Sequence, residues 1–218
     1  MSAAGTRAAA QRDGTLEARN LVKNFRLRDG LKFSTLHAVK DVSFSLVPGR
    51  TIALVGESGS GKSTIARMIA KLETPSSGQI LIDGARSGVR GRSLARYRRD
   101  VQMVFQDPFG SLNPFHSILH HLERPLRIHH PGWSTREVTD RAYELLERVQ
   151  LTPAASFARR RPHELSGGQR QRVAIARALA PGARFIVADE PVSMLDVSIR
   201  LGVLNLLADL QREEQLGV

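Results

Sequence analysis

Apolar residues near the start of the chain occur in short runs that are typical of β-strands. Such runs lie within residues 16–27 and again within residues 37–47. In the second stretch, Val42, Phe44 and Leu46 alternate with serines. Successive side chains of a strand point to opposite faces, so this alternation places one face against a core. We therefore expect two strands of an antiparallel sheet.

Shorter apolar runs predict strands in the rest of the chain. They lie at residues 51–55, 79–83, 101–105 and 185–188. The first of these runs leads directly into a glycine-rich loop. The last is uninterrupted in its apolar character, which is typical of a strand in a buried parallel sheet.

Helical periodicity follows the glycine-rich loop. Ile65, Met68, Ile69 and Leu72 recur at the spacing of one helix face. The Thr-Pro-Ser-Ser-Gly sequence at residues 74–78 contains strong helix breakers, so we expect the helix to end there.

The stretch from residue 111 to residue 162 is mainly helical in pattern. Its clearest helix starts at Ser134, where Glu137, three residues later, completes the sequence of a capping box. Its apolar face is predicted to contain Val138, Ala142, Leu145, Leu146 and Val149. A further amphipathic helix is expected at residues 198–211.

Strands that alternate with helices predict an α/β fold with a mainly parallel sheet core. The N-terminal strands are expected to form an antiparallel β subdomain, and the helical stretch an insertion into the core. We expect a flexible tail at residues 1–14 and one domain at residues 15–218. Within it, the core comprises about residues 15–110 and 165–218, and the helical subdomain about residues 111–164.

Composition narrows the class of protein. The sequence has 218 residues and no cysteine, so disulfides and thiolate chemistry are excluded. No apolar run reaches the roughly 20 residues that a membrane-spanning helix needs. We therefore expect any contact with a membrane to be made through a partner protein.

The formal net charge is +11, and arginines cluster at residues 86–99 and 159–161. Basic clusters of this kind occur at nucleic-acid interfaces and also on ordinary solvated surfaces. The clusters here lack the interleaved aromatic residues of a single-strand binding platform. Charge alone therefore leaves both interpretations open.

A glycine-rich sequence between the predicted strand at 51–55 and the following helix has the pattern of a phosphate-binding P-loop. It contains Gly56, Glu57, Ser58, Gly59, Ser60, Gly61, Lys62, Ser63 and Thr64. Glycines let backbone N–H groups approach phosphate oxygens, and Lys62 adds a positive charge. Ser63 offers a hydroxyl to Mg²⁺, and the helix that begins here directs its positive end at the same phosphates. This predicts the P-loop NTPase fold.

Two adjacent carboxylates follow the apolar run at residues 185–188. The carboxyl ends of parallel strands form the edge at which ligands bind, so Asp189 and Glu190 are expected there. Asp189 is predicted to hold Mg²⁺, and Glu190 to orient and polarise the attacking water. Such a pair also occurs on solvated strand ends. Its presence in a chain that also contains a P-loop favours a role at the nucleotide site.

A second candidate anion site lies just before the helical run at residues 170–180. Its residues are Leu165, Ser166, Gly167, Gly168 and Gln169. A serine and two glycines at a helix start expose a hydroxyl and free N–H groups. One nucleotide does not need two such sites from one chain, so this site is predicted to contact a nucleotide held by another subunit. The alternative is an ordinary serine N-cap with glycines for a turn.

The sequence at 165–169 resembles the signature motif of ATP-binding-cassette (ABC) proteins. Gln106 matches the family's Q-loop glutamine, which the resemblance implies reaches Mg²⁺ and senses the γ-phosphate. Residues 193–196 resemble the D-loop, which implies that Asp196 lies at a nucleotide between two subunits. Phe25 stands where the family has an aromatic residue that stacks on adenine. The resemblance therefore assigns catalysis to Lys62, Gln106 and Glu190.

Residues 104–114 are similar to the Q-loop region of the oligopeptide, dipeptide and nickel importer branch. The resemblance implies an ATPase that binds ATP and Mg²⁺ and drives transport of peptides or similar small solutes. Implied partners are transmembrane permease subunits, docked around residues 109–125, and a second ATPase subunit, identical or related. An extracellular solute-binding protein is an indirect partner, and no nucleic acid is expected. The implied location is the cytoplasmic face of the cell membrane, as a peripheral subunit.

Members of this family have a switch histidine after one further core strand, and the 218 residues contain no match to either. We therefore expect a C-terminally truncated cassette whose nucleotide binding outlasts its hydrolysis. Two alternatives remain: a nucleotide-binding module that does not hydrolyse ATP, and a soluble ABC ATPase that acts on nucleic acid. The sequence does not identify the transported solute.

Overall fold

The computed structural model describes residues 14–30 and 32–218, so the predicted tail at residues 1–14 lies outside the described residues except for Gly14. An antiparallel sheet occupies the first part of the chain, with strands in the order β2-β1-β3-β4. The strands are β1 (Leu16–Asp29), β2 (Lys32–Leu46), β3 (Ser77–Ile82) and β4 (Ala85–Arg86). The two N-terminal strands predicted from the sequence are confirmed, and the run at residues 79–83 joins the same sheet.

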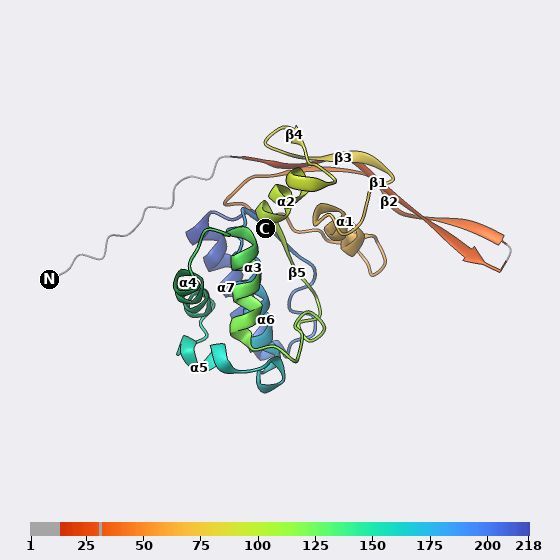
Figure 1. Cartoon of the computed structure of the whole chain (residues 1–218). Coiled ribbons are helices and arrows are strands. Elements are labelled where there is room, and N and C mark those ends of the chain that lie inside the picture. Colours follow the sequence, from red (N-terminus) through yellow and green to blue (C-terminus); the bar gives the residue numbers. More distant parts are fainter. Residues whose placement is uncertain (1–13, 31) are drawn as a thin grey trace.

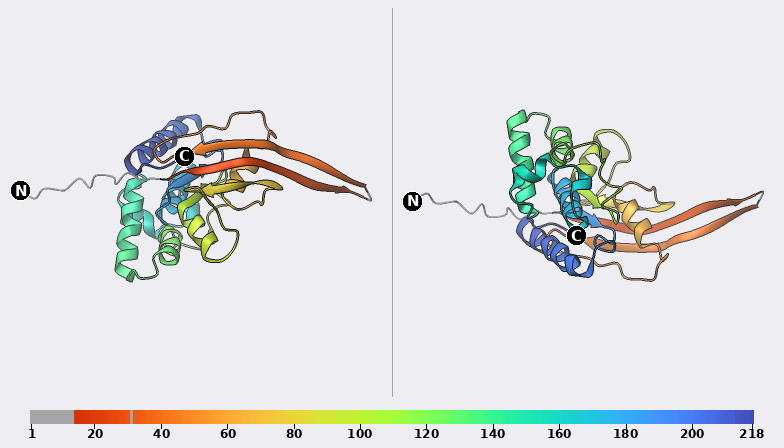
Figure 2. Two further views of the ribbon diagram at one scale, coloured as in Figure 1. Left: turned by 90° about the horizontal axis from the view of Figure 1, so that it is seen from above. Right: turned by 90° about the horizontal axis from the view of Figure 1, so that it is seen from below.

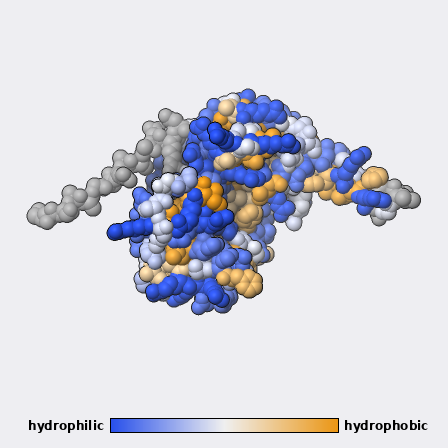
Figure 3. Space-filling view, in the orientation of Figure 1, coloured by the Kyte–Doolittle hydropathy of each residue, from blue (hydrophilic) through white to orange (hydrophobic). Residues whose placement is uncertain are grey.

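Strands β1 and β2 form a ribbon that projects beyond the rest of the molecule (Figures 1 and 2). They pair from Leu16↔Leu46 to Asp29↔Lys32, whereas β3 pairs with β1 only as far as Val22↔Ser77. The outer part of the hairpin is therefore two-stranded. Its hydrophobic residues are visible on the surface in Figure 3. They include Leu27, Phe33 and Leu36, all of which are exposed.

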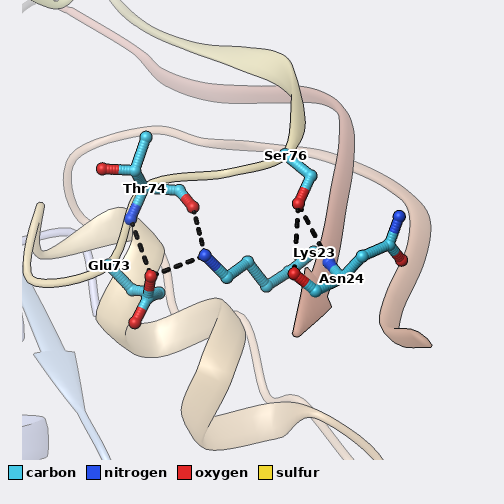
Figure 4. A network of polar contacts seen from close by, with 5 residues as sticks. All are labelled: Lys23, Asn24, Glu73, Thr74 and Ser76. Carbon is cyan, nitrogen blue, oxygen red and sulfur yellow. Dashed lines mark hydrogen bonds and ion pairs between the residues drawn. The ribbon is translucent and has the colours of Figure 1, made fainter. Parts of the chain in front are cut away.

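A polar network fixes the base of the ribbon to the segment after the first helix (Figure 4). The Lys23 ammonium donates to the Glu73 carboxylate at 2.6 Å and to the Thr74 carbonyl at 2.8 Å. The Ser76 hydroxyl accepts a hydrogen bond from the Asn24 backbone N–H at 3.0 Å. The side chain of Lys23 is largely buried, which strengthens its attraction to Glu73.

The parallel part of the fold is small. Strands β5 (Val101–Val104) and β6 (Phe185–Ala188) pair in parallel, and an isolated parallel bridge joins Phe185 to Gly217. The prediction of a strand at residues 51–55 is wrong. Hydrogen bonds with Val218 reach Arg50 and Ile52, but no described strand pairs with residues 53–55. Residues 53–55 are exposed, and Val55 is 93% exposed.

The predicted helical stretch is confirmed as α3 (Ile118–His129), α4 (Thr135–Arg148), α5 (Ala154–Arg159) and a short 3₁₀ turn, η1 (Pro162–Glu164). The capping box forms as expected, because the Ser134 hydroxyl accepts from the Glu137 N–H and Glu137 accepts from the Ser134 N–H. The predicted apolar face of α4 is fully buried. The division between this stretch and the core remains a prediction.

The other helices are α1 (Lys62–Ile69), α2 (Gly91–Asp100), α6 (Gly167–Leu179) and α7 (Val197–Glu214). Helix α1 ends before Leu72, which is exposed and does not extend the predicted apolar face. The first turns of α6 and α7 pack closely, since a Cβ at Gly168 would lie 2.5 Å from Ile199 Cγ2. No helix of the described residues is long and apolar enough to span a membrane.

Two apolar clusters form the core. One joins the antiparallel sheet to α1 and β6, and contains Leu16, Leu21, Met68, Ile80 and Phe185 among its members. The other joins the helical stretch to β5, α6 and α7, and contains Val104, Leu122, Leu145, Ile175 and Leu206 among its members. Strands β5 and β6 thus lie between the two clusters, so their carboxyl ends are held between the sheet and the helices.

Candidate nucleotide-binding site

The glycine-rich loop folds against the second strand of the ribbon. Gly61 has φ of +93° and immediately precedes α1. A Cβ at this position would lie 2.3 Å from the Ala38 carbonyl oxygen. A side chain is therefore excluded both by the left-handed backbone conformation and by the approach of β2. This glycine brings the start of α1, with its unpaired N–H groups, to the loop.

The Lys62 ammonium lies inside the loop. Its Nζ donates to the carbonyl oxygens of Gly56 at 2.9 Å and Glu57 at 2.8 Å. Ser60 closes the turn through its N–H, which donates to the Glu57 carbonyl at 3.2 Å. An ammonium has three N–H donors, so Lys62 can bind a phosphate oxygen by exchanging these backbone partners. The loop residues Gly56, Glu57, Ser58, Gly59 and Ser60 are exposed, as a loop that receives a ligand must be.

Ser63 and Asp189 meet across the two halves of the site. The Ser63 hydroxyl donates to Asp189 Oδ1 at 2.9 Å, and Asp189 is 8% exposed. Ser63 lies in the first turn of α1, and Asp189 follows β6 directly. A hydroxyl and a carboxylate are the hard oxygen ligands that Mg²⁺ prefers. These residues therefore fit the predicted metal, and the contact brings together two residues 126 positions apart in the sequence.

The structure also brings Gln106 to Glu190. Gln106 Nε2 donates to Glu190 Oε2 at 3.1 Å and to the Ser193 hydroxyl at 3.1 Å. Glu190 has φ of +45°, an unusual conformation for a residue with a side chain. Such conformations persist where the surrounding structure imposes them, often at functional sites. Glu190 is exposed, so water can reach its carboxylate.

The contact of Ser193 with Gln106 was not predicted from the sequence. Ser193 ends a turn in which its N–H and its hydroxyl both donate to the Glu190 carbonyl, each at 3.1 Å. A serine three residues after a candidate catalytic glutamate is the signal that indicates such a turn. Ser193 therefore contacts both the Gln106 amide and the backbone of Glu190.

The sequence at residues 165–169 forms the start of α6. The Ser166 hydroxyl accepts from the Gln169 N–H at 3.3 Å, and Gln169 Oε1 accepts from the Ser166 N–H at 3.0 Å. This is the capping geometry that the alternative interpretation predicts. Gly167 lies against Leu195, because a Cβ there would be 3.2 Å from Leu195 Cδ2. The binding of a second subunit's nucleotide by this segment remains a prediction.

The remaining predicted contacts lie at the margins of the site. Phe25 lies on β1 and pairs with Leu36 of β2. Leu36 is two residues before Ala38, whose carbonyl oxygen packs against Gly61. The Lys23 Nζ lies 4.8 Å from the Phe25 ring centroid, so one face of the ring is taken by a cation. Asp196 is at the N-cap position of α7, is exposed and makes no capping hydrogen bond with its side chain. Thr64, in the first turn of α1, is half-buried.

A cavity of about 450 Å³ opens beside the P-loop. Lys62, Asp189 and Glu190 line its polar end. Much of the remaining wall is apolar and includes Ile52, Leu54, Ile186, Leu204 and Leu207. The segment that fails to form a strand is thus one wall of this cavity.

Comparison with known proteins places these features in context. The family model described as "ABC transporter" matches residues 39–193. The chain is 50% identical over 204 residues to the glutathione import ATP-binding protein GsiA of Escherichia coli, covering 91% of this chain and 32% of that protein. It is 47% identical over 213 residues to the oligopeptide transport ATP-binding protein AppF of Bacillus subtilis, covering 95% and 64%. The chain therefore spans about a third of one curated relative and under two thirds of the other.

Solved structures agree in fold. The dimeric, post-hydrolysis structure of the ATP-binding cassette MJ0796 bound to ADP and Pi superimposes with a TM-score of 0.77 at 34% identity, covering 92% of this chain and 84% of that one. The structure of CbiO1 from Clostridium perfringens, part of the ABC transporter complex CbiONQ, gives a TM-score of 0.76 at 27% identity, covering 92% and 75%.

Proposed function

Because this chain belongs to the ABC transporter family, we propose that it binds ATP with Mg²⁺, hydrolyses it, and thereby energises an importer of peptides or similar small solutes. One observation carries the proposal above all. Ser63 of the P-loop helix is hydrogen-bonded to Asp189, and the adjacent Glu190 is hydrogen-bonded to Gln106. Four predicted site residues from three separate parts of the sequence thus form two linked contacts.

The P-loop residues bind the nucleotide's phosphates in this proposal. Gly61 allows the start of α1 to approach a phosphate, and Lys62 exchanges the carbonyls of Gly56 and Glu57 for phosphate oxygens. Phe25 offers the ring face that Lys23 does not cover to the adenine base. Stacking on an aromatic ring is open to any base, so this contact adds affinity more than discrimination.

Glu190 acts as the base that orients and polarises the attacking water. Its exposed carboxylate can accept a proton from water, and Gln106 holds one of its oxygens in place. Ser63 and Asp189 would hold Mg²⁺, which neutralises phosphate charge when bound. Lys62 supplies the second positive charge on the phosphates.

A second ATPase subunit completes the site. We assign the Ser166–Gln169 segment and Asp196 to the nucleotide held by that subunit, because one nucleotide does not need two anion sites from one chain and the exposed side chain of Asp196 makes no capping hydrogen bond. The dimeric state described for MJ0796 supports this assignment.

The membrane partners are transmembrane permease subunits, which this chain contacts as a peripheral subunit at the cytoplasmic face of the cell membrane. An extracellular solute-binding protein is an indirect partner. The names of GsiA and AppF support a peptide-type solute. Residues 109–125 are the proposed docking segment, since Phe109 and Phe115 are exposed there and large exposed aromatics favour protein contacts.

Nucleotide titration tests the binding half of the proposal. Lys62→Ala removes the ammonium inside the P-loop and is expected to weaken Mg-ATP binding by about tenfold or more, measured with a fluorescent ATP analogue. Lys40→Ala removes an exposed lysine of β2 and serves as the matched control, with no change expected. Equal affinity of the two variants would reject the P-loop assignment.

A second candidate function is a nucleotide-binding module that does not hydrolyse ATP. The observation that favours it is the lack of strand pairing at residues 53–55 within the described chain, because this segment leads into the P-loop. Tight Mg-ATP binding without Glu190-dependent hydrolysis would select this alternative.

A further inference from the structure

Gln171 is a buried amide whose hydrogen bonds are incomplete. It lies in the second turn of α6 and has no exposed surface. Its Nε2 donates to the Phe105 carbonyl at 3.5 Å, the outer limit for a hydrogen bond. Its Oε1 is buried and has no partner among the described residues. A buried acceptor without a donor costs folding free energy, so a polar group in this place calls for an explanation.

The amide points at the segment that carries Gln106. Phe105 links the end of β5 to Gln106, whose own side chain contacts Glu190 and Ser193. The backbone N–H of Asp107, on the other side of Gln106, donates no hydrogen bond within the described residues. A free donor therefore lies two residues from the carbonyl that Gln171 already contacts.

A side-chain amide presents a donor and an acceptor side by side in one plane. In extended backbone, the C=O of one residue and the N–H of the residue two positions later point to the same side, as they do when a strand pairs with its neighbour. The amide of Gln171 thus matches the Phe105 C=O and the Asp107 N–H, the two groups that flank Gln106. In this structure the chain bends at Gln106, and the first of the two contacts is made.

We propose that Gln171 is a positioning residue for Gln106: a two-point clamp from the signature helix α6 to the backbone on either side of Gln106. The second hydrogen bond, from the Asp107 N–H to Gln171 Oε1, forms when residues 105–107 straighten. The clamp rests on the proposed function in that it fixes the Gln106 amide beside Glu190. It also joins α6, whose N-cap is Ser166, to the nucleotide site of its own chain.

Amide hydrogen exchange in the full chain tests the clamp without reference to activity. In the wild type, the Asp107 N–H is expected to exchange more slowly with saturating Mg-ATP than without it. In Gln171→Leu, which keeps the size of the side chain and removes both hydrogen bonds, this protection should be lost. Identical exchange at Asp107 in the two proteins, with nucleotide and without it, would overturn the proposal.

Kinetics separates positioning from a purely structural role. Gln171→Leu is expected to lower kcat about tenfold and to leave the Mg-ATP affinity within about twofold, because it displaces Gln106 and not the P-loop. Gln106→Ala with Gln171→Leu should be no slower than Gln106→Ala alone, since both changes remove one contact with Glu190. Additive losses, or an unchanged kcat, would contradict the clamp.

A matched control variant and a readout independent of hydrolysis distinguish failure of the clamp from failure of the proposed function. Gln102→Leu changes another glutamine of the same region, whose amide bonds the Arg98 carbonyl at the far end of β5, and should leave kcat within about twofold. If the wild type shows no Glu190-dependent hydrolysis, the proposed function fails. The exchange rate of the Asp107 N–H then decides the clamp alone.

Discussion

The apolar residues of the helical stretch and those of the segment before the P-loop differ in burial. Leu122, Leu126 and Leu145 are fully buried, whereas Leu54 is 41% and Val55 93% exposed. The helices pack on one another and on α6. Residues 53–55 have no strand neighbour among the described residues. An apolar run becomes part of the core only where another helix or strand packs on it. The pattern of apolar residues does not reveal whether such a helix or strand is present.

The largest expected effect is on the buried side of this comparison. Leu145→Ala should lower the free energy of unfolding by about 3 kcal/mol, through lost burial and the cavity left behind. Val55→Ala should change it by less than about 0.5 kcal/mol, because the side chain already contacts water. Urea denaturation of both variants measures the contrast. Similar losses would mean that residues 53–55 are covered in solution.

Two capping boxes that start with a serine, at Ser134 and Ser166, allow a structural helix start to be compared with a predicted functional one. Ser134→Ala and Ser166→Ala each remove a serine N-cap hydrogen bond and should each cost about 1 kcal/mol of stability. Ser166→Ala should in addition reduce ATP hydrolysis, whereas Ser134→Ala should not. Thermal unfolding and hydrolysis, measured on both, check this. Equal activities would favour the interpretation of residues 165–169 as an ordinary cap.

The smallest expected effect is a pH dependence within the helical stretch. Burial lowers the pKa of His121 from its usual 6.5, and its Nε2–H donates to the Asn113 carbonyl at 3.0 Å. A histidine whose folded pKa is lowered contributes stability fully above pH 6.5, and this is lost as the pH falls below 6.5 towards the folded pKa. Denaturant unfolding between pH 7.5 and pH 5 should therefore show falling stability.

His121→Gln keeps a side-chain donor and removes the titration, so it should flatten that slope. Burial also lowers the pKa of His129. This residue accounts for part of the pH dependence of stability that remains in His121→Gln. An unchanged slope in His121→Gln would exclude this residue as a source of the pH dependence.

Local chemistry was predictable where its cause is local. The capping box at Ser134 needs two residues three apart, and the P-loop needs glycines around a lysine, so both are readable in the sequence. The alternation from Val42 to Leu46 likewise reports a strand directly. The capping box and the strand appear in the structure as predicted. Phosphate binding by the P-loop residues stays a prediction.

The features that were missed depend on distant partners. The length of the β1–β2 ribbon was not predicted. Phe33 and Leu36 of β2 pair with residues of β1, and no third strand among the described residues supports this part of the hairpin. The contact of Ser193 with Gln106 joins residues 87 positions apart. The strand predicted at residues 51–55 failed because strand formation depends on the neighbour and not on the apolar run.

Steady-state ATP hydrolysis by the 218-residue chain, compared with its Glu190→Gln variant, tests the central claim most directly. The account predicts Mg²⁺-dependent hydrolysis that falls by about 100-fold or more in the variant, with ATP binding retained, because Glu190→Gln removes the base and leaves the P-loop intact. Equal rates in the two proteins would contradict it. Binding without hydrolysis in the wild type would also contradict it and would select instead the nucleotide-binding module that does not hydrolyse ATP.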